Sequence, residues 1–228
     1  MGQVFGKNGV AEPAYDVLYK NNGHFAYEVR KYGQRFAAEA QYNGDDNSPF
    51  MILAKYIGVF GTPENEGKEA IAMTAPVVKD SNNVRGGTAI AMTAPVVKSK
   101  EAGTGDRDGF KTMDFILPAE YDTYSKIPKP TNPQVTIKEI PPAVGVVHRF
   151  NGSMDDKRAD EMARQLALQL QQDGLKEMTE EYVLDHYQFW GYNPPFTLPM
   201  FRRNEVWVEI NEKELDILVN GVTARDAN

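Results

Sequence analysis

The sequence contains no cysteine in its 228 residues. Disulfides, zinc–thiolate sites, iron–sulfur clusters and thiol nucleophiles are therefore excluded. No run of apolar residues approaches the roughly 20 that cross a bilayer, and the first residues lack the apolar core of a secretory signal. We therefore expect a cytoplasmic protein with no integral membrane segment.

Positive charge is also in short supply, because 25 Lys and Arg stand against 32 Asp and Glu, for a net charge of -7. A general nucleic-acid-binding protein would show a basic face, so we expect no nucleic-acid partner. Simple electrostatic attachment to anionic membranes is disfavoured for the same reason. The 41% hydrophobic and 25% charged residues are ordinary for a soluble globular protein, and the length suits one sizeable domain.

Common catalytic and cofactor motifs are missing too. The sequence holds no P-loop, GxGxxG, HExxH, GxSxG or CxxCH pattern. His24, His148 and His186 are widely spaced, and nothing in the sequence makes them converge on a metal ion. The acidic pairs Asp155-Asp156 and Glu180-Glu181 stand beside the starts of predicted elements, where solvated caps explain them better than catalytic carboxylates. We predict no catalytic residue and no metal site.

One phrase is present twice, because Ile71 to Lys79 recurs letter for letter as Ile90 to Lys98. Each copy reads as a strand, and the turn residues Asp80 to Gly87 separate them, so we expect strands of one hairpin or its extension. Pro76 and Pro95 suit edge or bulge positions. Since the terminal lysine is the only titratable group of each copy, a structural role as a strand that backs a cleft is favoured.

Hydrophobic periodicity predicts an order of elements that is repeated along the chain. In the first half, two strands precede a helix that opens at Ser48-Pro49 and carries an apolar stripe. The stripe consists of Phe50, Leu53, Ala54 and Ile57. The predicted strands of this half are 25–32, 35–42, the repeated phrase and 112–117. The second half has predicted strands 135–140, 144–150, 182–190 and 205–210 around a helix at 153–172.

The repeated order indicates an α+β fold. We expect a distorted antiparallel β-barrel of two pseudo-twofold βαββ-like halves, with two main helices packed on the sheet. The domain is expected to span 14–210. It would follow a flexible N-terminus at 1–13 and precede a mostly polar C-terminal tail at 211–228. In that tail only Leu215, Ile217, Leu218 and Val219 are available to dock on the body.

The loop Gly191 to Phe201 is rich in proline and large apolar side chains. It reads either as a hydrophobic lid on the protein's own core or as one wall of a cleft for a flat apolar ligand. The apolar stripe of the first helix would then form the opposite wall, although such a stripe is more often core.

Several of these segments together resemble the SOUL haem-binding proteins. Five motifs occur in the order found in that family, and the resemblance runs from about Ala14 to Ile210. The motifs are Tyr27-Glu28-Val29-Arg30-Lys31-Tyr32, the Met-Thr-Ala-Pro-Val phrase, Met113-Asp114-Phe115-Ile116-Leu117-Pro118, Tyr192-Asn193-Pro194-Pro195 and Arg202-Arg203-Asn204-Glu205-Val206-Trp207. The tandem phrase, with Met1 to Lys7 and Lys55 to Glu66, is most similar to the plant and green-algal cytosolic branch.

The resemblance implies reversible binding of b-type haem, held non-covalently, or of another tetrapyrrole, for carriage or buffering. It implies a cleft between the first helix and the loop before the last strand. By position it nominates Phe50, Ala54, Lys55 and Leu198, and the apolar pattern adds Leu53, Met200 and Phe201. Proteins of haem metabolism are the expected partners, and a monomer the expected state.

The sequence departs from the family pattern at positions that hold haem. One branch has a proposed axial histidine where this chain has Lys31, and a protonated lysine is a poor iron ligand. Another branch has an arginine and a lysine near the propionates, where Asn47 and Leu198 stand here. Lys55 remains as a propionate partner. We therefore expect a mostly hydrophobic site of modest affinity without a defined axial ligand; His24, Met73 and Met92 are candidate ligands.

Two other functions remain open at this stage. The two-half architecture also occurs in GyrI-like ligand-binding proteins and hydrolases, so an enzyme that releases iron from haem or hydrolyses a small ligand is one alternative. An interaction module that uses the helix at 153–172 is the other. Met1 to Lys7 also resembles a myristoylation site, except that the pattern requires Ser or Thr where Gly6 stands, so a plain flexible N-terminus is the favoured interpretation.

Overall fold

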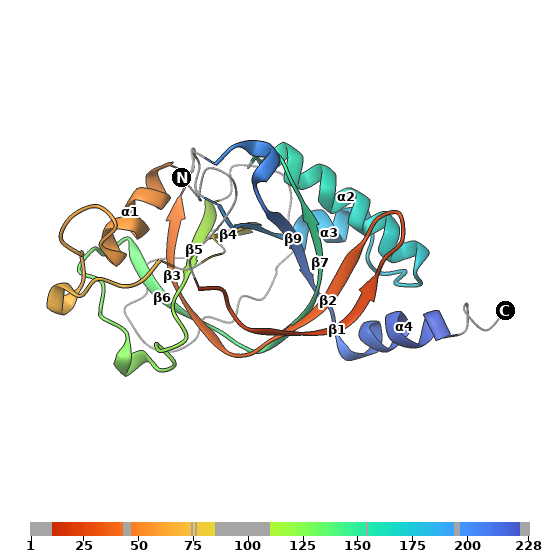
Figure 1. Ribbon diagram of the computed structural model, residues 1–228, viewed down its shortest axis with the longest axis horizontal. Helices are drawn as coiled ribbons and strands as arrows, with labels where there is room; N and C mark the ends of the chain where they lie inside the picture. Colours follow the sequence, from red (N-terminus) through yellow and green to blue (C-terminus); the bar gives the residue numbers. More distant parts are fainter. Residues whose placement is uncertain are drawn as a thin grey trace.

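A single curled antiparallel sheet forms the body of the protein (Figure 1). The computed structural model describes residues 11–42, 47–73, 75, 77–84, 110–153, 155–193 and 197–223. The strands are β1 (Tyr15–Asn21), β2 (Tyr27–Tyr32), β3 (Arg35–Tyr42), β4 (Val77–Val84), β5 (Phe110–Ile116), β6 (Val135–Ile140), β7 (Ala143–Phe150), β8 (Gln188–Gly191) and β9 (Asn204–Glu209). This confirms the predicted α+β class and the barrel-like antiparallel sheet.

The strand order shows that the two halves are interleaved. The sheet runs β1-β2-β7-β9-β8-β4-β5-β3-β6, so β2-β7-β9-β8 mirrors β6-β3-β5-β4 about the β8–β4 contact. Apart from β1, which pairs with β2 at one edge, the first strand of each half in the sequence therefore pairs in the other half, β2 with β7 and β6 with β3. Neither half has its full set of strands without the other, and the two must fold as one domain.

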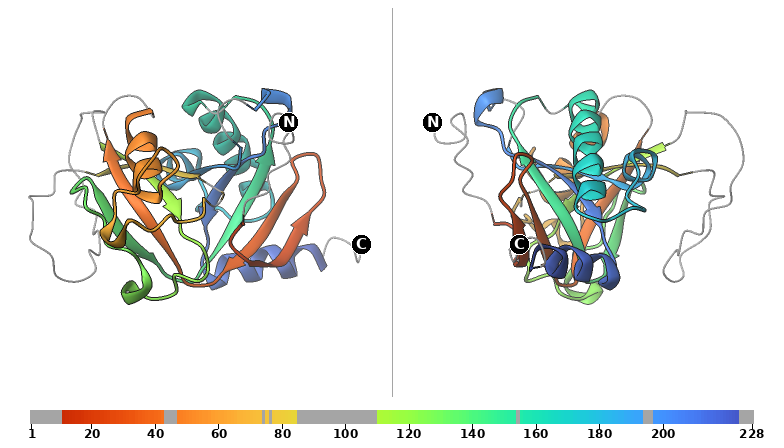
Figure 2. Two further views of the ribbon diagram at one scale, coloured as in Figure 1. Left: turned by 60° about the vertical axis from the view of Figure 1, so that its left-hand side comes forward. Right: turned by 90° about the vertical axis from the view of Figure 1, so that its right-hand side faces the viewer.

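The described residues contain four α-helices, of which the first two occupy equivalent places in the two halves (Figures 1 and 2). They are α1 (Asn47–Ile57), α2 (Asp156–Gln172), α3 (Glu180–His186) and α4 (Glu212–Thr223). Helix α1 contacts β3, β5 and β6, whereas α2 contacts β7 and β9. Short 3-10 turns are present at Glu66–Lys68 (η2), Tyr124–Lys126 (η3) and Pro199–Phe201 (η4). No helix in the described ranges is both long and apolar enough to cross a membrane.

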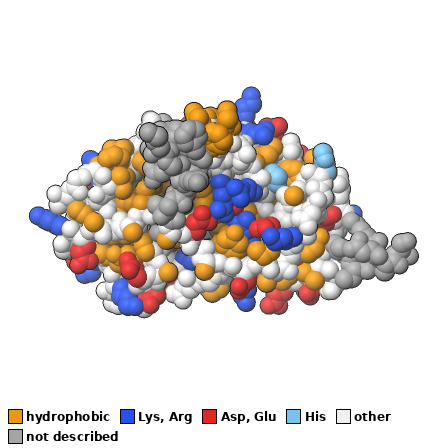
Figure 3. Space-filling model, viewed as in Figure 1, with side chains coloured by type: hydrophobic (Ala, Val, Ile, Leu, Met, Phe, Trp, Pro, Cys, Tyr) orange, Lys and Arg blue, Asp and Glu red, His pale blue; other side chains and the backbone are white. Residues whose placement is uncertain are grey.

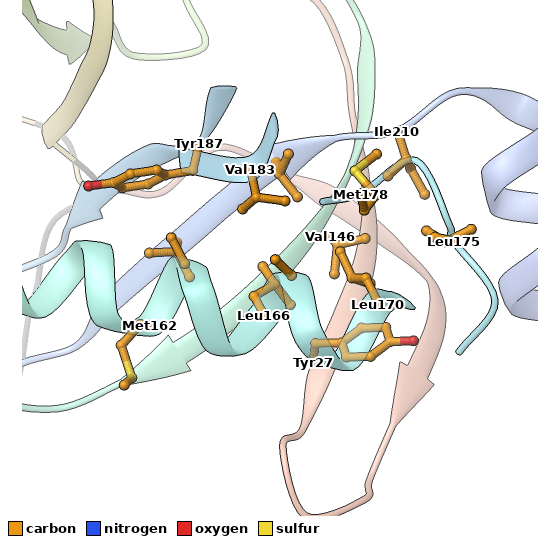
Figure 4. Close-up of a cluster of buried hydrophobic side chains, with 14 of the residues drawn as sticks. Tyr27, Val146, Met162, Leu166, Leu170, Leu175, Met178, Val183, Tyr187 and Ile210 are labelled. Atoms are coloured by element: carbon orange, nitrogen blue, oxygen red, sulfur yellow. The ribbon is translucent and has the colours of Figure 1, made fainter. Parts of the chain in front are cut away.

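The largest apolar cluster lies between α2 and the strands of the second half (Figure 4). Helix α2 points a stripe of buried side chains at the sheet, among them Met162, Leu166 and Leu170. They meet Val146 of β7 and Val183 of α3, both of which are buried. This is the i, i+4 stripe that an amphipathic helix places against a sheet. The helix that was predicted at 153–172 is thus confirmed, with its start at Asp156 and an N-cap at Asp155.

A second apolar cluster lies under α1. Leu53 and Ala54 of α1 are fully buried against Phe36 of β3 and against Met113 and Phe115 of β5. The apolar stripe of the first helix is therefore mainly core, as such stripes usually are. Burial of these side chains supplies much of the free energy that holds α1 on the sheet.

The third cluster lies on the opposite, inner face of the curled sheet. It contains Tyr32, Trp190, Tyr192 and Trp207, each at most 4% exposed. These residues alternate along their strands with residues of the other two clusters, because successive side chains of a strand point to opposite faces. The inner face is thus built from the same strands as the helix-covered face.

The segment 182–190 is not one strand, contrary to the sequence prediction. It is divided between α3, which ends at His186, and β8, which starts at Gln188. Thr179 caps α3 by accepting a hydrogen bond from the Tyr182 amide, and its acidic residues Glu180 and Glu181 occupy the first turn. A capped helix start favoured by two carboxylates thus competes successfully with the β-branched and aromatic residues that suggested a strand. The sequence analysis also missed β1.

The first copy of the repeated phrase supplies a central strand. Its end enters β4, which begins at Val77 and pairs with both β5 and β8. Strand β4 thereby joins the two halves of the sheet. The expectation that the two copies form strands of one hairpin or its extension stays a prediction. The second copy, Ile90 to Lys98, and both prolines assigned to edge or bulge positions lie outside the described residues.

Both ends of the described chain contact the body. The Ala75 amide donates to the carbonyl of Ala11, and Glu12 pairs with Arg203. At the other end, Leu218 of α4 is buried and Leu215 packs on the cluster under α2. Of the four tail residues predicted to be available for docking, the remaining two, Ile217 and Val219, are exposed.

Candidate functional site

The helix side of the predicted cleft is only partly accessible. Phe50 is half-buried, and its ring meets Phe115 edge-on with centroids 5.4 Å apart. Leu53 and Ala54 are completely buried, and Lys55 is exposed. Phe50 and Lys55 are therefore the members of this wall that a ligand can reach, whereas Leu53 and Ala54 support the wall from beneath.

The loop side of the predicted cleft carries a cluster of exposed hydrophobic side chains. Leu198, Met200 and Phe201 are 43%, 68% and 42% exposed. Hydrophobic side chains gather over η4 at the top of the molecule in Figure 3. The turn is anchored rather than free, because the Pro199 carbonyl accepts from the Gly152 amide at 3.0 Å. Exposed apolar groups on an anchored turn are typical of a binding surface.

None of the contacts given above joins α1 to η4 across the predicted cleft. Neither of the two cavities discussed below includes residues of α1 or η4. Residues 43–46 and 194–196, next to these two elements, lie outside the described ranges. The cleft between α1 and the loop therefore stays a prediction.

A first cavity, of about 180 Å³, lies where the two halves meet on the helix-bearing face. Its walls include Lys79 at the start of β4 and Lys111 of β5, which both bond Asp156 of α2, at 2.7 and 2.6 Å. Burial opposes the charged form of Asp156, but the hydrogen bonds from the two lysines outweigh it and lower the pKa of this carboxyl. Lys79, the terminal lysine of the first repeated copy, is thus a link between the two halves.

A network of buried charges occupies the inner face. Glu205 is fully buried, and it accepts from Arg30 at 2.9 Å, from the Tyr192 hydroxyl at 2.7 Å and from Arg203 at 2.9 Å. Arg30 also pairs with Glu28 at 2.8 Å. A buried carboxylate is stable only when its lone pairs are satisfied in this way.

Burial and the charge of Glu205 shift the pKa values of the groups in this network. Burial, and then the charge of Glu205, raise the pKa of Tyr192 well above its usual value. Burial raises the pKa of Tyr32 to about 12. For Arg30, burial acts to lower the pKa, but the charge of Glu205 outweighs it. Tyr192 and Tyr32 therefore stay protonated near neutral pH, and Tyr192 donates its hydroxyl proton to Glu205 in a hydrogen bond.

Sequence reasoning found one part of this network and missed the rest. Two adjacent arginines beside a strand start, such as Arg202 and Arg203, predict either an anion site or a local ion pair with Glu205, and the structure contains the pair of Arg203 with Glu205. The contact of Arg30 with Glu205 spans 175 positions of the sequence, and no local pattern signals it. The sequence gives one signal for this contact, because each motif places a charged residue within a predicted strand. If such a strand is central in the sheet, the buried charge requires a partner of opposite charge.

The histidines with described partners are held by backbone carbonyls. His148 Nδ1 lies 2.7 Å from the Ala26 carbonyl oxygen, so Nδ1 carries the proton. Its ring stacks on Phe25 at 3.8 Å, and burial lowers its pKa. His186 Nδ1 likewise donates to the Tyr182 carbonyl. Within the described ranges, no three His, Asp or Glu side chains are grouped to hold a metal ion.

The three positions where this chain departs from the family pattern of haem-holding residues lie in different places, and one of them is Leu198, the residue before η4. Lys31 is an exposed residue of β2, and Asn47 is the first residue of α1. His24, one candidate iron ligand, is exposed in the turn before β2. Met73, the second, packs on the cluster under α1, whereas Met92 lies outside the described residues.

Comparison with known protein families gives one match, to the model described as "SOUL heme-binding protein". It matches residues 10–86 and 78–209, which together cover most of the chain. The first match contains the first copy of the repeated phrase, and the second match contains the second copy. No curated protein matches the sequence.

Solved structures show only distant likeness. The C-terminal domain of EcmrR and a hydrolase encoded by lin2189 from Listeria innocua each have a TM-score of 0.47 and 10% identity. Each match covers 81% of this chain, with 96% and 91% of the respective other chain. SAV2435 bound to tetraphenylphosphonium has a TM-score of 0.36 and 8% identity, over 82% and 95% of the two chains. Likeness at this level supports no inference about function.

Proposed function

Because the chain belongs to the SOUL heme-binding protein family, we propose that it binds haem or a related tetrapyrrole reversibly, as a carrier or buffer. The observation that carries the proposal is the match to the family model along residues 10–209. Haem would be held non-covalently, since the sequence has no cysteine to form a thioether bond. The plant and green-algal branch remains a prediction.

For the site, we propose the surface between α1 and η4. Three exposed apolar side chains, Leu198, Met200 and Phe201, would cover one face of the macrocycle. Phe50 would contact it from α1, with Leu53 and Ala54 supporting that helix from the core. The exposed Lys55 would meet a propionate. Since the two described cavities hold about 180 and 80 Å³, below the 300–1,000 Å³ typical of ligand pockets, an open surface site suits a tetrapyrrole better than either cavity.

The proposal is tested by hemin titration of the purified protein. A saturable shift of the Soret band is expected for the parent chain. Leu198→Asp should weaken binding about tenfold or more, because it places a charge against an apolar macrocycle. Leu168→Asp is the matched control, since Leu168 is 52% exposed on α2, away from η4. Absence of a Soret shift in the parent would refute haem binding, whereas equal binding by Leu198→Asp would refute this site alone.

A parallel titration with protoporphyrin IX separates macrocycle recognition from iron coordination. Equal affinity for the two ligands is expected if the site is apolar and supplies no axial ligand. Much tighter binding of hemin would instead indicate an iron ligand. Anaerobic release of metal-free porphyrin from hemin would identify an enzyme rather than a carrier.

A further inference from the structure

The side chain that η4 exposes most is a methionine. Met200 has an exposed fraction of 68%, the largest of any large hydrophobic side chain in the part of the chain that the structure describes. Leu198 and Phe201, which flank it in the same turn, are 43% and 42% exposed. Methionine differs from both because its thioether sulfur is oxidised to a sulfoxide, which is polar. Met200 is therefore the member of this apolar cluster whose polarity can change after folding.

The other described methionines are better protected. Three are buried, with exposed fractions of at most 5%: Met113, Met162 and Met178. Met73 packs on the cluster under α1, and Met51 of α1 is 39% exposed. The sequence has no cysteine, so no thiol competes for an oxidant. Among the described methionines, accessibility thus directs an oxidant to Met200 first.

Hydrogen bonds hold the turn that carries Met200. Arg202 Nε donates to the Thr197 carbonyl at 2.8 Å, which closes the turn around Met200. At the base of the loop, Asn193 Oδ1 accepts from the Arg203 amide at 2.7 Å. Moving Met200 into the core would break these bonds, so the thioether stays at the surface.

Oxidation of Met200 would change the surface that we propose for the tetrapyrrole. The thioether sulfur is a weak hydrogen-bond acceptor, whereas the sulfoxide is polar and holds water. Covering the sulfoxide with an apolar macrocycle removes this water without supplying a donor, and that cost opposes binding. Leu198 and Phe201 keep their apolar surfaces, so the affinity should fall rather than vanish.

We propose that Met200 is an oxidation site through which peroxide weakens tetrapyrrole binding, an inference that rests on the function and the site proposed above. The Met200 sulfur takes one oxygen atom from hydrogen peroxide and becomes a sulfoxide. The sulfur loses two electrons, and the peroxide is reduced to one molecule of water. Because methionine sulfoxide reductases reverse this change, the site is a reversible switch between tighter and weaker binding.

The order of oxidation is the first measurement. The ligand-free protein is treated with a graded series of hydrogen peroxide concentrations, and mass spectrometry of its peptides quantifies the sulfoxide at each methionine. Met200 is expected to be oxidised before Met51, and well before the three buried methionines. Oxidation of Met51 ahead of Met200 would overturn the proposal.

Hemin titration, after the peroxide has been removed, is the second measurement. The oxidised parent should bind hemin about tenfold more weakly than the untreated parent, with an unchanged circular dichroism spectrum. Methionine sulfoxide reductases should restore the affinity. Absence of hemin binding by the untreated parent would refute the proposed function and the switch together. Equal affinity before and after oxidation of Met200, with weak binding by Leu198→Asp, would refute the switch and retain the site.

Two variants locate the effect, and each is compared only with itself before and after peroxide. Met200→Leu has an apolar side chain without an oxidisable sulfur, so the ratio of its two affinities should stay at about one. Met51→Leu is the matched control, because it removes the second most exposed of the described methionines and should show the same loss as the parent. A loss in Met200→Leu as large as that in the parent would place the effect at another methionine and overturn the proposal.

Discussion

The helix-covered face of the sheet and its inner face are built from the same strands but held by different forces. Val29 and Val206 face the helices and lie in an apolar cluster. Their neighbours Arg30 and Glu205 face inwards and form a buried ion pair. Burial of apolar area is tolerant of partner identity, whereas a buried charge requires one particular partner. The inner face therefore explains why the motifs contain charged residues at fixed positions.

The comparison predicts the largest loss of stability for a broken charge network. Glu205→Ala leaves Arg30 and Arg203 without their shared carboxylate, so it should lower the free energy of unfolding by about 3–5 kcal/mol in a urea titration. Glu209→Ala, on the same strand and face but exposed, should change it by less than about 0.5 kcal/mol. Equal effects of the two variants would mean that the arginines find other partners.

On the helix-covered face, a substitution that leaves a cavity in the apolar cluster should also lower the free energy of unfolding. Leu166→Ala removes a fully buried side chain of α2 and should cost about 2–5 kcal/mol, measured in the same way. Its control is Leu168→Ala, where the side chain is 52% exposed and the cost should stay near zero. A small loss at Leu166 would indicate that α2 shifts to fill the space.

Removal of the N-cap side chain of α2 should lower the free energy of unfolding by a smaller amount. Asp155 accepts from the Arg158 amide at 2.8 Å, so Asp155→Ala should cost about 1 kcal/mol in thermal or urea unfolding. Asp155→Asn retains a capping oxygen and should remain close to the parent. If Asn and Ala are equally destabilising, the charge of Asp155 matters more than its capping bond.

The smallest effect on the free energy of unfolding is expected for Asp156, which links the two halves through Lys79 and Lys111. The folded pKa of Asp156 lies below its unfolded value, so its contribution is present above pH about 4 and is lost as the pH falls further. Because the carboxyl is 48% exposed, the contribution should stay below about 1 kcal/mol. The difference in unfolding free energy between the parent and Asp156→Asn should therefore close from pH 5 to pH 2. A difference that does not vary with pH would exclude the two lysine contacts as its source.

Local patterns were sufficient for most elements. The alternation of Tyr27 to Tyr32, the stripe of α1 and the periodicity of α2 each predicted the element that the structure contains. The failure at 182–190 occurred because short apolar runs fit helix and strand equally well. The predicted site residues were found on α1 and η4, but their accessibility could not be read from the sequence. Leu53 and Ala54 share a stripe with Phe50, and only packing distinguishes them.

The sequence by itself determined the fold class, most of the elements and the family, since these depend on periodicity and motifs within short segments. Tertiary structure alone decided that β2 pairs with β7 and β6 with β3, each in the other half. It also decided the partners of the charged residues. Those choices depend on contacts such as that of Arg30 with Glu205, 175 positions apart. A period of two says that a side chain faces inwards, but the residue it meets there is decided by the strand order.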